Sequence, residues 1–293
     1  MAGVCFSVVV GFSFYAVKIC VPIASTIQIL AFRYNFAFLG AIVPVLTRRA
    51  VVEIRGKKKK ALLWAASLYI GFMILQTIGL IFATSIESAI IFAIIPIIAK
   101  IVAAIFLDEH STWKQNVFAC LSVSALIFMI VMSAGDVEAN LLGITILFLS
   151  SVSMAVSNVI MRYVRKEHKP FTVPFFTAAL GAVCFNLAYV AWMLVTEGGL
   201  GGYFAPCVNL TFVLATAYLG IPCLVLSSWL MSYMLGYIQA IQATIFGNLS
   251  TAISIVAGIV ILREPLAFYH AACVLLIITG VIGVSATAKK EGA

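Results

Sequence analysis

Long apolar runs separated by short polar stretches make up almost the whole chain. Ten such runs are present, at 3–21, 25–47, 61–83, 86–107, 114–134, 141–162, 172–196, 209–232, 238–262 and 267–287. Each is close to the roughly 20 apolar residues that a helix needs to cross a bilayer. In lipid every backbone N–H and C=O must be paired within the spanning segment, which favours helices. The pattern therefore predicts an all-α integral membrane protein with about ten transmembrane helices.

The charges in the polar stretches predict how the runs are oriented. Basic residues gather in alternate stretches, at 48–60, 162–169 and 289–290. Of the stretches between them, two carry Asp136, Glu138 and Glu197 without Lys or Arg, and the one after the ninth run carries a single Arg263 beside Glu264. Because basic loops face the cytoplasm, we expect both termini to be cytoplasmic and the protein to lie in the cell inner membrane.

Composition agrees with this class of protein. Hydrophobic residues form 64% of the chain and charged residues 10%, and the mean hydropathy is +1.17. A soluble domain has about 45–50% apolar and about 25% charged residues. The net charge of +8 sits in short clusters that indicate topology, so nucleic acid is not an expected partner. Ten spans leave no room for a soluble catalytic domain.

The two halves of the chain resemble each other. With an offset of 155 residues (264 minus 109), Glu109 aligns with Glu264 and Leu107 with Leu262, each pair ending a long apolar run. We expect one five-helix repeat over 1–135, a second over 140–288, and a cytoplasmic tail over 289–293. Five is an odd number, so the second repeat enters the membrane inverted, which is typical of secondary transporters.

Several short motifs lie in a characteristic order. They are Gly11-Phe-Ser-Phe-Tyr-Ala-Val-Lys18, Ala31-Phe-Arg33-Tyr-Asn-Phe-Ala37, Pro96, Leu107-Asp-Glu109-His-Ser111 and Leu262-Arg-Glu264-Pro-Leu266. Together they resemble the drug/metabolite transporter superfamily, in its ten-helix EamA-type branch, over essentially the whole chain. The resemblance implies ten helices around a central cavity and transport of small organic solutes. The ninth run departs from it, because Thr251 stands where a proline is often found, and this run is expected to be less kinked or differently hydrated.

Charged side chains inside the runs are candidates for function, because each costs about 2.5–3.5 kcal/mol in the bilayer on insertion scales. Lys18, Arg33 and Glu87 are all expected in the outer half of the membrane and predict an outer gate or charge network. The alternative is that Lys18 and Glu87 extend to the interface while Arg33 makes a buried structural pair.

Lys100 lies one turn after Pro96, which removes a backbone hydrogen bond and predicts a kink that frees the Phe92 carbonyl. Lys100 then becomes a candidate for binding an anionic group of a substrate. The alternative is that its ammonium group reaches the cytoplasmic interface.

Uncharged polar and aromatic residues complete the predicted cavity. They share a costly or bulky side chain inside an apolar run: Gln76, Asn158, Gln242, Asn248, Tyr15, Tyr69 and Trp229. Hydrogen bonding between helices, or plain packing, is the alternative for each. Glu109 and Glu264 are read as structural acids at helix ends, where a carboxylate favours the N-terminus of the helix that follows.

These features predict a secondary transporter that moves a small organic metabolite, such as an amino acid or a similar zwitterion, by alternating access without ATP. The lipid bilayer and a small-molecule substrate are the expected partners, and monomer and homodimer both remain open. The seven cysteines have no metal-ligand spacing, and we expect no cofactor or metal. The alternatives are a non-transporting scaffold or specificity subunit, and an intramembrane enzyme, for which the chain lacks His-Glu-x-x-His and Gly-x-Ser-x-Gly motifs.

Overall fold

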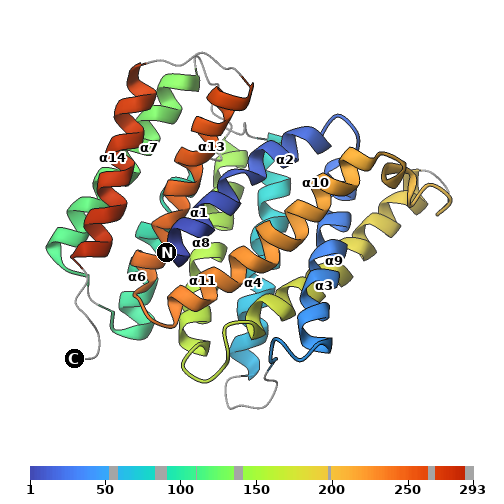
Figure 1. The fold of residues 1–293 in the computed structure, drawn as a ribbon, viewed down its shortest axis with the longest axis horizontal. Helices are drawn as coiled ribbons and strands as arrows, with labels where there is room; N and C mark the ends of the chain where they lie inside the picture. Colours follow the sequence, from blue (N-terminus) through green and yellow to red (C-terminus); the bar gives the residue numbers. More distant parts are fainter. Residues whose placement is uncertain are drawn as a thin grey trace.

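Helices form most of the described chain in the computed structural model (Figure 1), which describes residues 1–52, 59–82, 91–109, 111–134, 141–196, 199–262 and 268–287. No strand occurs within those ranges. The helices are α1 (Ala2–Gly11), α2 (Ser13–Cys20), α3 (Thr26–Leu46), α4 (Lys59–Phe82), α6 (Ile95–Leu107), α7 (Trp113–Ala134), α8 (Leu141–Val164), α9 (Thr172–Thr196), η1 (Ala205–Val208), α10 (Leu210–Gly220), η2 (Ile221–Leu226), α11 (Ser227–Leu235), α12 (Ala240–Thr244), α13 (Phe246–Leu262) and α14 (Phe268–Ala286).

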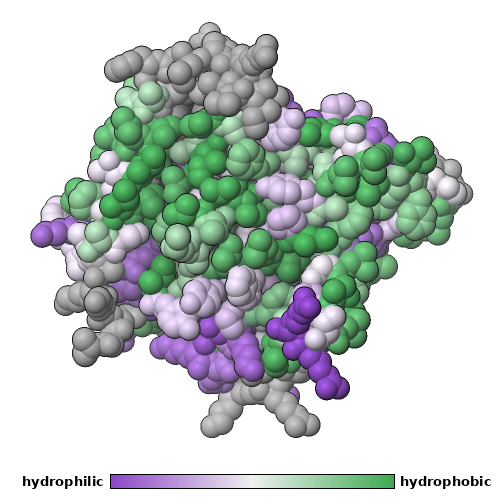
Figure 2. Space-filling view, in the orientation of Figure 1, coloured by the Kyte–Doolittle hydropathy of each residue, from purple (hydrophilic) through white to green (hydrophobic). Residues whose placement is uncertain are grey.

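Each of the ten apolar runs contains one of these helices or a consecutive group of them. Six helical stretches of the described chain are long and apolar enough to cross a membrane, and α6 and Ala271–Ala286 are shorter apolar helices. Apolar side chains cover most of the face in Figure 2, and hydrophilic surface gathers at its lower edge. The predicted all-α integral membrane fold is confirmed.

The two halves of the chain interleave in a symmetric way. Helix α7 packs on α14 and α3 packs on α9, which pairs the fifth run with the tenth and the second with the seventh. The contact of α1 with α13 has its counterpart in that of α8 with α6, and α3 with α10 in α9 with α4. Exchanging the halves therefore reproduces the main helix contacts.

Several spans are interrupted. The first turns at Phe12 between α1 and α2, and the eighth contains a π-helical segment, η2, which holds Pro222 near its start. In the fourth span a turn at Ile94 precedes α6, and Pro96 lies in the first turn of that helix. The ninth span breaks at Ile245 between α12 and α13 with no proline present. The presence of Thr251 in place of a proline predicts a span that is less kinked or differently hydrated. The span is nevertheless broken, at Ile245.

Small residues let the first and ninth spans approach closely. A Cβ on Gly3 would lie 2.5 Å from the Phe246 ring, and one on Gly11 would lie 3.0 Å from the Ser250 carbonyl oxygen. Between them, the Ser7 hydroxyl donates to the Phe246 carbonyl oxygen at 2.8 Å. The bond joins α1 to the first residue of α13, directly after the break in the ninth span.

Candidate functional site

Three amide side chains lie buried inside the bundle on the sixth and ninth spans. Asn158 of α8 is 2% exposed, and Gln242 of α12 and Asn248 of α13 are each 3% exposed. The Gln242 carbonyl oxygen accepts the backbone N–H of Gln239 at 3.2 Å. The Gln242 Nε2 and Asn248 Nδ2 atoms have no hydrogen-bond partner in the described protein. An unpaired buried amide costs about 1–3 kcal/mol, which makes both groups suited to bind a polar solute.

The break in the ninth span explains the position of Asn248. Its backbone N–H bonds to the Ile245 carbonyl at 3.1 Å, a tighter turn than a regular α-helix makes. Next to it, a Cβ on Gly247 would meet no atom within 4 Å, so the backbone there borders open space. Discontinuous membrane helices of this kind commonly form solute sites in transporters.

Arg33 brings a positive charge into the bundle from α3, and we call Arg33, Gln242 and Asn248 the unpaired polar groups. Its side chain is half-buried, and its Nε is buried without a hydrogen-bond partner. Its charge acts on the hydroxyls of Tyr34 and Tyr69 and on the thiol of Cys223 in η2. No carboxylate pairs with it within the described residues. The predicted partner Glu87 lies outside those residues.

Tyr69 extends this cluster across the bundle. Tyr69 belongs to α4, and its hydroxyl lies near the hydroxyl of Ser228 on α11. Its ring contacts that of Phe72 at 5.8 Å, and Phe72 contacts Phe92 at 5.6 Å between ring centroids. The charge of Arg33 therefore sits beside a short row of aromatic faces.

The remaining predicted residues are more scattered. Gln76 and Lys100 are half-buried, and the Lys100 ammonium group makes no ion pair within the described chain. Tyr15 and Lys18 are exposed, and Trp229 faces a groove on the outside of the bundle. Glu264 lies outside the described residues.

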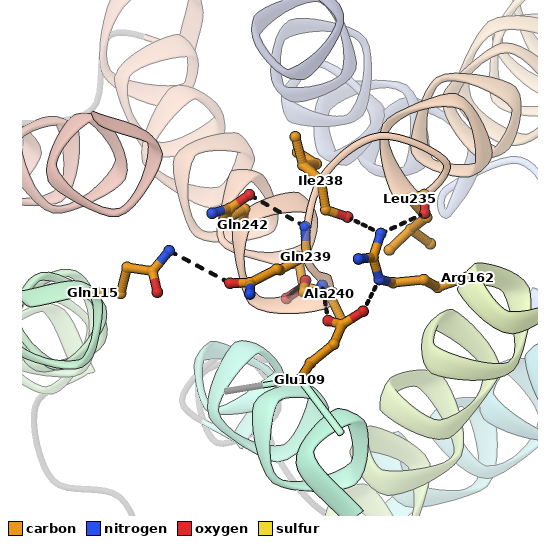
Figure 3. Close-up of polar contacts among 9 residues, drawn as sticks. Glu109, Gln115, Arg162, Leu235, Ile238, Gln239, Ala240 and Gln242 are labelled. Carbon is orange, nitrogen blue, oxygen red and sulfur yellow. Dashed lines mark hydrogen bonds and ion pairs between the residues drawn. The ribbon is translucent and has the colours of Figure 1, made fainter. Parts of the chain in front are cut away.

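A second polar site joins the helix ends at the lower edge of Figure 1, and Figure 3 shows it close up. The Glu109 carboxylate forms an ion pair with Arg162 of α8, and the two side chains are only 11% and 9% exposed. The other Glu109 carboxylate oxygen accepts the backbone N–H of Ala240 at 3.1 Å. Glu109 therefore caps the start of α12, rather than the start of the helix that follows it in the chain.

The reason for this placement is local. Asp108 adopts a left-handed conformation with φ of 55° at the end of α6, which turns the chain back toward the bundle. The Glu109 N–H then bonds to the Ala103 carbonyl at 3.3 Å. A sequence pattern shows the acid at the helix end, but the direction of its side chain follows from this turn.

Two arginines, one in the last turn of α8 and one in the loop after it, bind the end of α11. Arg162 donates to the carbonyl oxygens of Leu235, at 2.9 Å, and of Ile238. Arg165 donates to the Ser232 carbonyl at 2.9 Å. Cations at a helix C-terminus are stabilising because of its negative dipole end. Arg162 was counted only as a basic loop residue by sequence reasoning, and its position in the last turn of α8 was the available signal.

The same network reaches the fifth span. The Gln115 side chain of α7 donates to the Gln239 side chain, with 3.5 Å between nitrogen and oxygen. We call the set Glu109, Arg162, Gln115, Gln239 and Ala240 the helix-end network. It joins α6 and α7 of the first half of the chain to α8 and α12 of the second.

Comparison with known proteins places this architecture. The sequence profile of the EamA-like transporter family matches residues 1–131 and 141–286, nearly the whole chain in two parts. The chain belongs to the EamA-like transporter family. The unpaired polar groups and the helix-end network are thus features of an EamA-like transporter. The resemblance drawn from the motifs is confirmed.

Two relatives agree with this assignment. The chain is 37% identical to the uncharacterized transporter YcxC of Bacillus subtilis, over 99% of this chain and 94% of that one. It is 24% identical to an uncharacterized transporter of Archaeoglobus fulgidus, over 92% of each chain. A crystal structure of a protein 15% identical in sequence matches the fold with a TM-score of 0.78, covering 100% of this EamA-like chain and 98% of that one.

Proposed function

We propose that this EamA-like transporter moves a small organic solute that carries a carboxylate, such as an amino acid, by alternating access and without ATP. The observation that carries the proposal is a set of buried side-chain nitrogens without hydrogen-bond partners in the described protein: Gln242 Nε2, Asn248 Nδ2 and Arg33 Nε. Unpaired polar groups are costly in a membrane protein unless a ligand uses them. A scaffold that moves nothing has no need to carry this cost.

The charge of the unpaired polar groups favours a solute that carries a carboxylate. Arg33 is a cation with no carboxylate partner in the described chain, and its guanidinium has the geometry to bind a carboxylate through two parallel hydrogen bonds. The amides of Gln242 and Asn248 supply neutral donors. The rings of Tyr69, Phe72 and Phe92 offer faces to an ammonium group or an apolar side chain. Together these groups fit an amino acid better than a purely cationic solute.

Alternating access requires one side of the path to close while the other opens. The helix-end network is suited to close one side, because Glu109 and Ala240 come from opposite halves and Arg162 ties both to α11. By the charge rule this side faces the cytoplasm. In the proposed cycle, the halves 1–135 and 140–288 move apart there when the Glu109–Arg162 pair opens.

Counterflow in proteoliposomes tests the proposal. Vesicles containing only this protein are preloaded with a mixture of unlabelled standard amino acids, and uptake of a trace of the labelled mixture is measured. The same experiment with amino acid amides removes the carboxylate charge and keeps the rest of each molecule. We expect accumulation of the acids well above that of protein-free vesicles, and little accumulation of the amides.

The outcomes separate the parts of the proposal. Equal uptake of acids and amides would overturn the carboxylate preference and leave transport standing. No uptake of either set would overturn the proposed function and favour the scaffold reading. Loss of acid uptake in Arg33→Met, with normal folding, would assign the preference to that guanidinium.

A further inference from the structure

A groove outside the helix bundle lies between α3, the start of α9 and the η2–α11 segment. Its volume is about 430 Å³. Its lining is apolar along most of its length and basic at one end, and includes Gly40, Arg49, Lys169, Ile221, Leu226 and Trp229. None of its lining residues is among those proposed to bind the transported solute.

Local backbone geometry shapes the groove. At its deep end α3 and η2 nearly touch, since a Cβ on Gly40 would lie 2.8 Å from Ile221. In the π-helical segment Ile221 and Leu226 remain 43% and 39% exposed, and form an apolar wall. At the other end α3 stops at Leu46, and the Pro44 carbonyl accepts the N–H groups of Arg49 and Ala50 at 2.9 Å each.

Charge is concentrated at the end of the groove that lies beyond the helices. Arg49 lies in the loop shortly after α3 ends at Leu46, and Lys169 lies in the loop shortly before α9 begins at Thr172. Both side chains are exposed. The N-terminus of α9 adds the positive end of its dipole. Among the described residues, none that lines the groove is an acid. An amphiphile with a negative head and an apolar tail matches this arrangement of charge and apolar wall.

Aromatic residues indicate the depth of the site. Trp229 lines the groove, and the Tyr233 and Tyr237 rings continue from it along the end of the eighth span at 6.2 and 4.9 Å between successive centroids. Tyr233 and Tyr237 are 41% and 67% exposed. Trp and Tyr of this kind gather at the level of lipid headgroups.

We propose that this groove binds one anionic phospholipid, with its phosphate between Arg49 and Lys169 and an acyl chain along Ile221 and Leu226. A free phosphate would leave the apolar wall without a partner. A neutral phospholipid would gain little from the two cations, whereas basic pockets between membrane helices are suited to anionic headgroups. The site is separate from solute transport, and its existence does not depend on the proposed substrate.

Native mass spectrometry of the full-length protein tests the proposal. Purified protein is exchanged into mixed micelles holding equal amounts of phosphatidylglycerol and phosphatidylcholine, and the lipids retained after collisional stripping of the detergent are counted. The groove variant is Arg49→Gln with Lys169→Gln. The matched control is Arg48→Gln with Lys166→Gln, which removes the same charge from exposed positions on the same face but outside the groove lining.

We expect the protein to retain one phosphatidylglycerol in preference to phosphatidylcholine. Each basic residue near an anionic headgroup contributes about fivefold, so the groove variant should bind it about 30-fold more weakly while the control stays near the unaltered protein. Leu226→Trp, which narrows the groove without changing charge, should also weaken retention. Equal loss in the groove variant and the control would overturn the proposal, as would equal retention of the two lipids or competition by glycerol 3-phosphate at the lipid's own concentration.

Discussion

Two polar regions of this protein treat charge in opposite ways. In the helix-end network, Glu109 pairs with Arg162 and with the Ala240 N–H, and Arg162 also bonds two carbonyl oxygens. Among the unpaired polar groups, Arg33 has no carboxylate partner in the described chain, and Asn248 keeps an unpaired amide nitrogen. A satisfied network holds helices together, whereas unsatisfied groups can bind something else. The difference predicts which substitutions damage stability and which damage transport.

The largest effect on stability is expected at the helix-end network. Arg162→Met leaves the Glu109 charge buried without its partner and should cost about 3–5 kcal/mol. Thermal unfolding of the purified protein in detergent measures this loss. Adding Glu109→Gln to Arg162→Met should recover part of it, because no buried charge then remains unpaired. An Arg162→Met variant as stable as the parent would contradict the assignment of this network as a structural closure.

The largest effect on transport is expected at Arg33, one of the unpaired polar groups. Arg33→Met removes the proposed carboxylate partner, and uptake of the acids in the counterflow assay should fall by about a hundredfold, in line with a charged hydrogen bond of about 1.5–3 kcal/mol. Its melting temperature should change little, because no described ion pair is lost. Arg33→Lys, which keeps the charge, serves as the conservative variant and should retain part of the uptake. A fall in stability similar to that of Arg162→Met, with uptake preserved, would reverse the comparison.

A smaller effect with opposite signs is expected at Asn248. Asn248→Leu replaces an unpaired buried amide by an apolar side chain of similar size, so stability should rise by about 1 kcal/mol. Uptake should fall by about tenfold as a hydrogen bond to the solute is lost. Measuring unfolding and uptake on the same preparation tests both signs. Decreases in both would mean that the Asn248 amide is paired within the protein.

The smallest effect is expected at Ser7, which contacts the break in the ninth span and would not touch the solute. Ser7→Ala removes the hydroxyl that bonds the Phe246 carbonyl at the break in the ninth span, and should cost about 1 kcal/mol. Ser13→Ala is the matched control, because the Ser13 hydroxyl bonds only the nearby Val10 carbonyl. Thermal unfolding distinguishes the two. Equal losses would show that the break needs no support from α1.

Much of the fold follows from local sequence. Each of the ten apolar runs overlaps a helix or helix group within the described residues, because burial in lipid depends on the hydrophobicity of each segment by itself. The first two basic stretches do lie together, as their alternation predicts, because Arg49 of one and Lys169 of the other line the same groove. Polar residues such as Asn158, Gln242 and Asn248 were also recognisable as inward-facing, since lipid does not solvate them.

The partners of these residues were decided only by the tertiary structure. Glu109 meets Arg162 and Ala240, which lie 53 and 131 positions away, and no local pattern records such distances. The ninth span breaks at Ile245 without a proline, and Ser7 of another helix donates to the Phe246 carbonyl directly after the break. Trp229 faces an outer groove because of how α3, α9 and η2 cross. Hydrophobicity along a segment sets where each helix forms, whereas the contacts between helices depend on turns and crossings that only the folded chain defines.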